Sequence, residues 1–256
     1  CGNVDDGPVI QTALNQGGLV QLSGACRLTT PLEIRTLWTE IRGPASVSGE
    51  MPWLAYIWTR EVSIQGIQWT NPVGGGLVID TPPGAPYLSG AVRFAGGKIN
   101  TRSPGIVAWR GTGLWVWATH FNGIAGGSYA AMLLDWDTAS FTDVLVEEHW
   151  ACIRLGSGWG ATTTISLMGV RCDRLQSVGH LIEPWGSGTV AFVQDWNGFW
   201  QGGVAPYLIN ASHVGPGRIT YVQIRNGLSI GQAMRETWIA GPVDLATIIA
   251  EIQFRP

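Results

Sequence analysis

Three carboxylates in the second half of the sequence, Glu148, Asp173 and Asp195, have a spacing that suits glycosidic bond cleavage if short strands stack on one another. Stacked strands repeat at about 4.8 Å, which places Glu148 and Asp173 one strand apart and Glu148 and Asp195 two strands apart. A retaining glycosidase holds its carboxyl groups about 5–5.5 Å apart, and an inverting one about 6.5–9.5 Å. We therefore treat the three residues as candidate catalytic groups. Asp195 has a nominally inward position, and a bulge that turns it outward is an equal alternative.

A solvated charged face is the competing interpretation of these acids. Glu147 and Arg171 alternate at equivalent positions of the pattern, and exposed pairs of this kind contribute only about 0–1 kcal/mol. If the acids are catalytic, Glu148→Gln or Asp195→Asn should abolish cleavage of a polysaccharide and leave thermal stability nearly unchanged. The sequence has no Cys-x-x-Cys pair and no evident cluster of aspartates. We therefore expect no metal and no cofactor.

Tryptophan is the most unusual residue type, with 14 copies in 256 residues. In the segment 114–117, strand alternation turns Leu114 and Val116 inward and leaves both tryptophans outward. Exposed aromatic rings stack on sugars, and aromatic side chains dominate binding interfaces in general. The predicted carbohydrate-binding residues are Trp115, Trp117, Trp150, Trp196, Arg171 and Arg225. The alternative is that the rings fill a subunit interface or pack between strands.

Further tryptophans lie in or beside predicted turns, namely Trp159, Trp185 and Trp200. Asp135 and Asp137 flank Trp136, and two carboxylates around an indole could grip a sugar. A polar turn is the favoured interpretation of that cluster.

The elements that must position these residues follow a repeated motif: apolar, any, apolar, any, any, apolar. Clear copies start at Val62, Ile165 and Ile219, and looser ones at Val92, Leu114, Phe141 and Val190. The starts are about 22–30 residues apart, a period typical of stacked supersecondary units. The first, third and sixth positions point inward and a corner separates the last two, so each turn should contribute to three short sheets. Six residues past successive starts lie His120, Glu147, Arg171, Trp196 and Arg225, which should then form one column.

The chain reads as one domain, 1–256. Residues 1–18 form an N-terminal cap with a short helix, for which Asp6 is the expected N-cap, Pro8 fits the first turn and Gly17 the end. Residues 19–227 form the rungs. Residues 228–256 lose the motif and form a C-terminal cap or an oligomer contact, with 242–254 a helix or a swapped strand. Four asparagines should occupy left-handed corner positions, namely Asn71, Asn122, Asn197 and Asn226.

The segment VDDGPVIQTALNQGGLVQLSGACRLTTPLEI resembles the entry of the pectate-lyase-like right-handed β-helix superfamily, as it occurs in phage tailspikes. There an acidic pair precedes a short capping helix, a glycine pair, a first strand and a proline-containing first rung. The resemblance covers about residues 2–43 and implies an all-β fold: a right-handed parallel β-helix (solenoid). It further implies a homotrimeric tailspike-like protein on the virion surface. The motifs of polygalacturonases and the calcium-binding aspartates of pectate lyases are missing.

Composition excludes several functions. The net charge of −3 argues against a nucleic-acid partner, and no apolar run reaches the length of about 20 residues that a membrane span needs. Charged residues make up only 13%, so broad apolar surface is available for self-association. Cys152 and Cys172 lie nearly one repeat apart and could form a disulfide, although buried free thiols are the favoured interpretation.

The sequence therefore predicts a phage tailspike-like virion surface protein that binds host cell-surface polysaccharide. Whether it also depolymerises that polysaccharide, as a glycoside hydrolase or a polysaccharide lyase, stays open. Other virion proteins are its expected partners. Two alternatives are a non-enzymatic virion structural protein, such as a capsid decoration or fibre, and a secreted bacterial polysaccharide lyase.

Overall fold

The computed structural model describes the whole chain except residues 3, 86–88, 158–161, 185–188, 203–204, 211–217, 220, 231–237, 241–248 and 255–256. Side chains are described through residue 202, apart from 126–127, 157–163 and 184–192, and beyond it only at Gly227. Within these limits the chain is one parallel β-solenoid of about seven turns with one short helix, as the motif predicts. No helix among the described residues combines the length and hydrophobicity needed to cross a bilayer.

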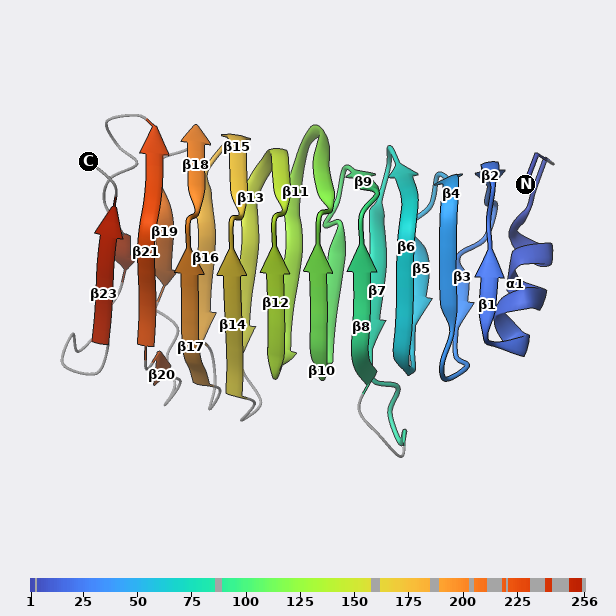
Figure 1. Ribbon diagram of the computed structural model, residues 1–256, viewed down its shortest axis with the longest axis horizontal. Coiled ribbons are helices and arrows are strands. Elements are labelled where there is room, and N and C mark those ends of the chain that lie inside the picture. The colour runs from blue at the N-terminus through green and yellow to red at the C-terminus, as the bar shows by residue number, and fades with distance from the viewer. Residues whose placement is uncertain are drawn as a thin grey trace.

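Each turn of the solenoid contributes to three sheets, which we call front, top and rear from their places in Figure 1. The front sheet contains β1 (Leu19–Gln21), β8 (Ser89–Ala95), β12 (Thr138–Thr142), β14 (Thr162–Met168), β17 (Thr189–Trp196), β20 (Arg218–Ile219) and β23 (Ile249–Phe254). The top sheet contains β2 (Gly24–Arg27), β9 (Lys98–Thr101), β15 (Arg171–Leu175) and β18 (Phe199–Gly202). The rear sheet contains β3 (Leu32–Ile34), β5 (Trp53–Ile57), β7 (Gly75–Asp80), β16 (Val178–Pro184), β19 (Ala205–Asn210) and β22 (Trp238–Ala240).

Six longer strands turn a corner and serve two sheets. β4 (Glu40–Ser48), β6 (Arg60–Asn71) and β21 (Tyr221–Ile230) run from front to top. β11 (His120–Trp136) and β13 (Leu145–Ser157) run from top to rear, and β10 (Ile106–Trp117) runs from rear to front. All the pairings are parallel, because each strand meets the same part of the next turn.

Alternation along each front strand builds the core. Val62, Val92, Leu114 and Ile165 lie in one inward column, and all are buried. Inward positions on the other two sheets add Trp69, Phe121 and Trp200 from the top and aliphatic residues from the rear. The core is therefore continuous along the axis, and the outward positions are left for function.

The corner between front and top sheets depends on residues in the left-handed conformation. Successive turns place Gly66, Gly96, Ala118, Asp143 and Gly169 there, with φ between 47° and 65°.

Asn197 continues this corner with φ 57°, which confirms the expectation for that asparagine. Asn71 and Asn122 do not have positive φ, so the same expectation is wrong for them. Asn71 is instead buried, and its amide donates to the carbonyls of Met51 and Gly75 at 2.7 and 2.8 Å. It therefore secures the top–rear corner.

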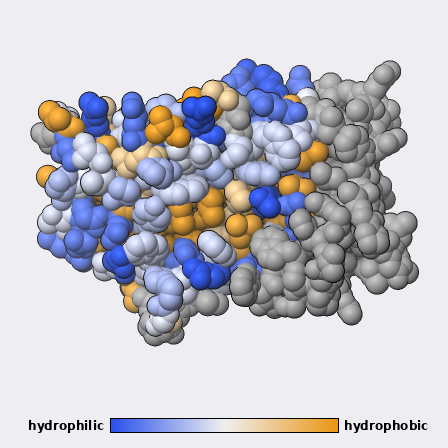
Figure 2. All heavy atoms as spheres, turned by 180° about the vertical axis from the view of Figure 1, so that it is seen from behind, coloured by the Kyte–Doolittle hydropathy of each residue, from blue (hydrophilic) through white to orange (hydrophobic). Residues whose placement is uncertain are grey.

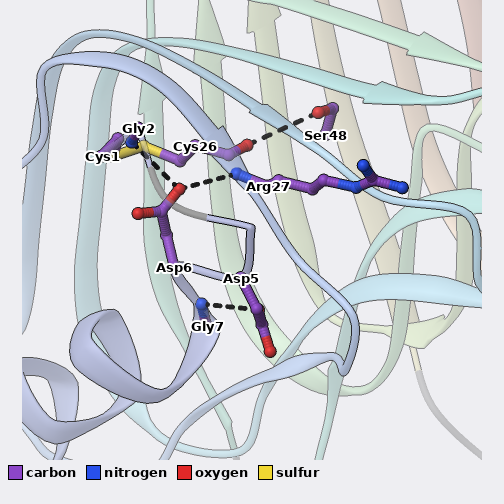
Figure 3. Close-up of a disulfide and its surroundings, with 8 residues drawn as sticks. All are labelled: Cys1, Gly2, Asp5, Asp6, Gly7, Cys26, Arg27 and Ser48. Atoms are coloured by element: carbon purple, nitrogen blue, oxygen red, sulfur yellow. Dashed lines mark hydrogen bonds between the residues drawn. A yellow bond between two sulfur atoms is a disulfide. The ribbon is translucent and has the colours of Figure 1, made fainter.

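The helix α1 (Gly7–Gln16) covers the N-terminal end of the core. Gly17 ends it with φ 71°, as expected, but Asp6 makes no side-chain cap. The carboxylate of Asp5 accepts from the backbone N–H of Gly7 at 2.9 Å, and Asp6 accepts from the N–H of Arg27 at 3.0 Å (Figure 3). The two aspartates therefore have different roles: Asp5 stabilises the start of the helix, and Asp6 connects it to β2.

Two disulfides connect the four cysteines, Cys1 with Cys26 (Figure 3) and Cys152 with Cys172. The expectation of buried free thiols was wrong. Cys172 lies on the inward face of β15 and Cys152 at the neighbouring corner of the turn before, with their Cα atoms 6.1 Å apart.

Near the C-terminus the ladders continue. β23 pairs in parallel with β21, from Tyr221 opposite Ile249 to Gly227 opposite Phe254. Of the two forms expected for 242–254, residues 249–254 adopt a strand.

The outward surface of the rear sheet is apolar along its middle (Figure 2). Tyr56, Val78, Val107 and Met132 are successive ladder partners there, each half-buried. We call these four residues the rear strip.

Candidate functional site

Outward side chains of the front sheet form a column of aromatic and apolar groups. Trp117, Thr142, Met168 and Trp196 are successive ladder partners on β10, β12, β14 and β17. We call them the tryptophan column. Trp117, Met168 and Trp196 are 41%, 43% and 39% exposed, which is unusual for such large apolar side chains. Three rung steps place the two indoles about 14 Å apart.

A second outward column runs beside the first. Trp115 pairs with Arg93 on one side and with Ser140 on the other, and Ser166 follows. The Arg93 guanidinium lies 5.2 Å from the centroid of the Trp115 ring, and its Nη1 is 3.5 Å from a carboxylate oxygen of Glu61. Trp115 is therefore half-buried and fixed by its contact with Arg93. The short side chains of Ser140 and Ser166 leave a polar surface beside the tryptophan column that does not protrude.

A shallow groove of about 400 Å³ follows the corner between the front and top sheets on the turns before that of Trp117. Glycine and proline form much of its floor, because the corner turns too tightly for large side chains. Its lining includes Gly24, Pro44, Ser46, Gly66, Gln68 and Lys98. The lining reaches Gly97 and Lys98, on the turn before Trp117, and the N–H of the neighbouring Gly96 donates to the carbonyl of Trp117.

The top sheet carries a network of ion pairs that includes two of the three predicted carboxylates, Glu148 and Asp173. Nε2 of His120 lies 2.7 Å from Glu147, and Arg174 reaches Glu147 at 2.9 Å and Glu148 at 2.7 Å. Burial lowers the pKa of His120, and the nearby charge of Lys98 lowers it further despite Glu147. Burial alone would raise the pKa of Glu147, but hydrogen bonds from Arg174 and His120 outweigh it and lower that pKa.

Asp173 belongs to the same surface. It is the ladder partner of Glu147 on the next turn, and it accepts from Nη2 of Arg171 at 2.9 Å. Arg171 in turn lies over the Phe199 ring at 4.6 Å. Glu147, rather than Glu148, is thus the acid one rung from Asp173.

Asp195 lies inside the solenoid. Its side chain is buried, and its Oδ2 is 3.6 Å from Nε2 of His180, which is also buried and packs edge-on to Trp200. Burial lowers the pKa of His180 to about 3. The inward position of Asp195 is confirmed, but its pairing with Glu148 on one face was wrong, because Glu148 is on the outside.

The predicted column of five residues is divided between two sheets. His120 lies in register with Leu145, Arg171 and Phe199 on the top sheet. Trp196 and Arg225 are ladder partners on the front sheet. The side chain of Arg225 lies outside the described residues.

Trp150 lies apart from the other predicted sugar-binding residues, at the top–rear corner. Its ring meets Tyr129 edge-on at a centroid distance of 5.5 Å, and the Arg154 guanidinium lies 5.8 Å from the Tyr129 ring on which Trp150 packs. Arg154 also pairs with Glu183 at 2.8 Å.

The favoured polar turn around Trp136 was wrong for two of the three residues, because Asp135 and Trp136 end strand β11 and are buried, and only Asp137 lies between β11 and β12. Asp135 has φ 52°, Trp136 is fully buried, and Asp137 accepts from the hydroxyl of Thr112. Trp200 is also in the core. Trp159 and Trp185 lie outside the described residues.

Sequence reasoning missed Met168, Thr142 and Arg174. Met168 occupies the fourth position of a clear motif copy, which is outward, so the signal was present. Arg174 gave no signal, because it reaches the acids from the left-handed corner position, with φ 51°. Among the described residues, no group of three or more His, Cys, Asp or Glu side chains is placed to hold a metal ion.

No family model matches the sequence, and no curated protein matches it. Among solved structures, the chain is similar to "Geobacillus virus E2 - ORF18", with a TM-score of 0.45 and 10% sequence identity. The alignment covers 90% of this chain and 60% of that one, so this chain spans about 60% of the length of that structure.

Proposed function

We propose that this protein binds polysaccharide on the surface of cells, as a tailspike-like component of a virion or as a secreted protein. The tryptophan column carries the proposal. Large apolar rings are normally buried, and here two indoles and a methionine stay exposed in line on a stiff parallel sheet. An extended face of a solenoid suits a long ligand.

Two further features support the proposal, one for the location outside the cytoplasm and one for the binding itself. Both disulfides need an oxidising environment to persist, which cell exteriors and virion surfaces provide. The rings of Trp117 and Trp196 are on regular strands, so little side-chain or loop ordering is needed when a ligand binds.

The test is affinity electrophoresis through native gels that contain host-type polysaccharides. Trp117→Ala and Trp196→Ala should each reduce retardation about tenfold or more, since buried aromatic anchors dominate binding energies. Trp109→Ala is the matched control, because Trp109 is similarly exposed but lies on the rear part of β10. Equal retardation of all four proteins would reject the proposal.

Depolymerisation is the second candidate. It is favoured by the ladder pairing of Glu147 with Asp173, because carboxylates one rung apart approach the separation of about 5–5.5 Å in retaining glycosidases. Fragment-size analysis of a bound polysaccharide tests it. Cleavage that disappears in both Glu147→Gln and Asp173→Asn would support an enzyme, and an intact polymer would leave binding alone.

A further inference from the structure

The tryptophan column is almost free of charge. From Gln65 through Ala95 to Trp196, the outward column on the front sheet carries no ionisable side chain. Arginines are the ladder partners at its two ends, Arg42 beside Gln65 and Arg225 beside Trp196, and Arg42 is paired with Glu40. In the parallel column, from Ser63 to Gln194, Arg93 is the ionisable residue, and Glu61 and the Trp115 ring accompany it. Hydroxyl and amide groups make up the rest of that column, and one exposed carboxylate, that of Asp143, lies at the corner after Thr142.

The groove that leads to the column has the same character. Among the lining residues Gly24, Pro44, Ser46, Gly66, Gln68 and Lys98, only the lysine is ionisable.

The neighbouring top sheet does have charges, but they balance within the network. Two arginines, Arg171 and Arg174, face three carboxylates, Glu147, Glu148 and Asp173, and a third cation, Lys98, is the ladder partner of His120. The arginines contact all three carboxylates at 2.7–2.9 Å. An anionic polymer would need cations that are not already neutralised, because each charge it brings must be paired when water is removed.

We propose that the ligand of this surface is an uncharged polysaccharide, lying parallel to the solenoid axis from the corner groove across Trp117 to Trp196. This inference rests on the proposed function and specifies the substrate class. The two indoles are about 14 Å apart across three rungs. They therefore stack on different sugars of one chain, with intervening sugars over Thr142 and Met168.

The spacing sets a minimum length for the ligand. An oligosaccharide must reach both indoles to gain both contacts, so affinity should rise steeply once the chain spans about three rungs, or roughly 14 Å. Monosaccharides should bind too weakly to measure.

Thr142 allows a test of ligand charge, because it lies between the indoles, is outward and is half-buried. Thr142→Lys and Thr142→Glu both lengthen the side chain and add opposite charges. The probes are neutral polymers (dextran, galactomannan, mixed-linkage β-glucan) and acidic ones (alginate, polygalacturonate, hyaluronate), run in native gels at low and at high salt. With a neutral ligand, both variants should weaken binding by similar factors, and salt should have little effect.

Three results would overturn the inference. Retention by acidic polymers alone, lost at high salt and shifted in opposite directions by the two variants, would identify an anionic ligand and leave the proposed function intact. Retention by no polymer would reject both. A wild-type oligomer that Trp117→Ala and Trp196→Ala convert to monomers, by sedimentation, would show that a second copy of the chain covers the column, and would also reject both.

Discussion

Two histidine side chains, His149 and His180, are buried in places that disfavour the charged imidazolium form. His149 is completely buried, and neither ring nitrogen has a hydrogen-bond partner among the described residues. Burial, together with the nearby His120, lowers the pKa of His149 to about 4. His180 is also buried, beside Asp195, and burial lowers its pKa to about 3.

Stability should therefore fall in acid. In the unfolded chain His149 titrates near its ordinary value of 6.5, so between pH 6.5 and 4 the unfolded state binds more protons. The contribution of neutral His149 is complete above pH 6.5, and about 2 kcal/mol of it should be lost at pH 5. Urea unfolding at pH 7 and pH 5 measures this loss. His149→Leu should lose less than the wild type, and equal losses would contradict the prediction.

Asp195 and Glu148 should respond differently to neutral substitution. The sequence led us to expect that neither Asp195→Asn nor Glu148→Gln changes stability. Because Asp195 is buried against His180, Asp195→Asn should destabilise the fold by about 1–3 kcal/mol. Glu148→Gln removes one exposed pair with Arg174 and should cost less than about 1 kcal/mol. Thermal melts compare the two variants, and an unchanged melting temperature for Asp195→Asn would refute the argument.

The corner between the front and top sheets contains a residue, Ala118, whose side chain is unfavourable for its backbone conformation. Ala118 holds φ 47° at a position that glycine occupies on other turns. A side chain in this conformation costs about 1–2 kcal/mol, so Ala118→Gly should stabilise the protein by up to about that amount. Ala95→Gly, in the strand of the preceding turn, is the control and should destabilise by about 0.5–1 kcal/mol. Chemical denaturation of both variants checks the sign, and destabilisation by Ala118→Gly would disprove the prediction.

The disulfide between Cys152 and Cys172 links two neighbouring turns covalently at one corner. Its loop of 20 residues should make it worth about 3 kcal/mol. The double variant Cys152→Ala/Cys172→Ala should unfold at correspondingly lower urea, and the reduced wild type should unfold at least as early. If the oxidised wild type and the double variant unfold together, the bond contributes no stability.

Strand register shows how far the sequence could predict the elements. The copies at Val62, Leu114 and Ile165 lie in one column, because their inward residues are large and regularly spaced. The column passes through Ala139 rather than Phe141, and a small alanine gives little hydrophobic signal.

The pairing of β14 with β17 also differs in register from the motif, for a different reason. Ile165 pairs with Val193 rather than Val190. Val190 pairs with Thr163, two residues earlier, and a bulge between Thr163 and Thr164 adds one more residue to β17. Hydrophobic spacing does not reveal a bulge, since it changes pairing without changing composition. The candidate sugar-binding tryptophans were still placed outward, because strand alternation is local. The acidic column depended on register across several turns and was therefore split between sheet and core.

For the whole molecule, the front and rear surfaces suggest different tasks. The rear strip is apolar and half-buried, and it lies opposite the proposed sugar-binding face. Large apolar patches on soluble proteins usually mark interfaces. We expect a homotrimer whose subunits meet along the rear strip.

Sedimentation equilibrium tests this arrangement. Val107→Glu/Met132→Glu should reduce the mass to that of a monomer, whereas Trp117→Ala should retain the mass of the wild type. A monomeric wild-type protein would rule out the expected assembly.

The parallel stacking of turns has a consequence for evolution. Each turn pairs with the turns next to it, so duplication of one unit, such as residues 139–164, would insert a layer and leave the other layers as they are. Every such event would lengthen the molecule by about 4.8 Å and move Trp196 one step farther from Trp117. The number of turns thus sets the distance between Trp117 and Trp196. Gain or loss of a turn is a simple genetic change that would adjust this distance to the repeat length of a different glycan.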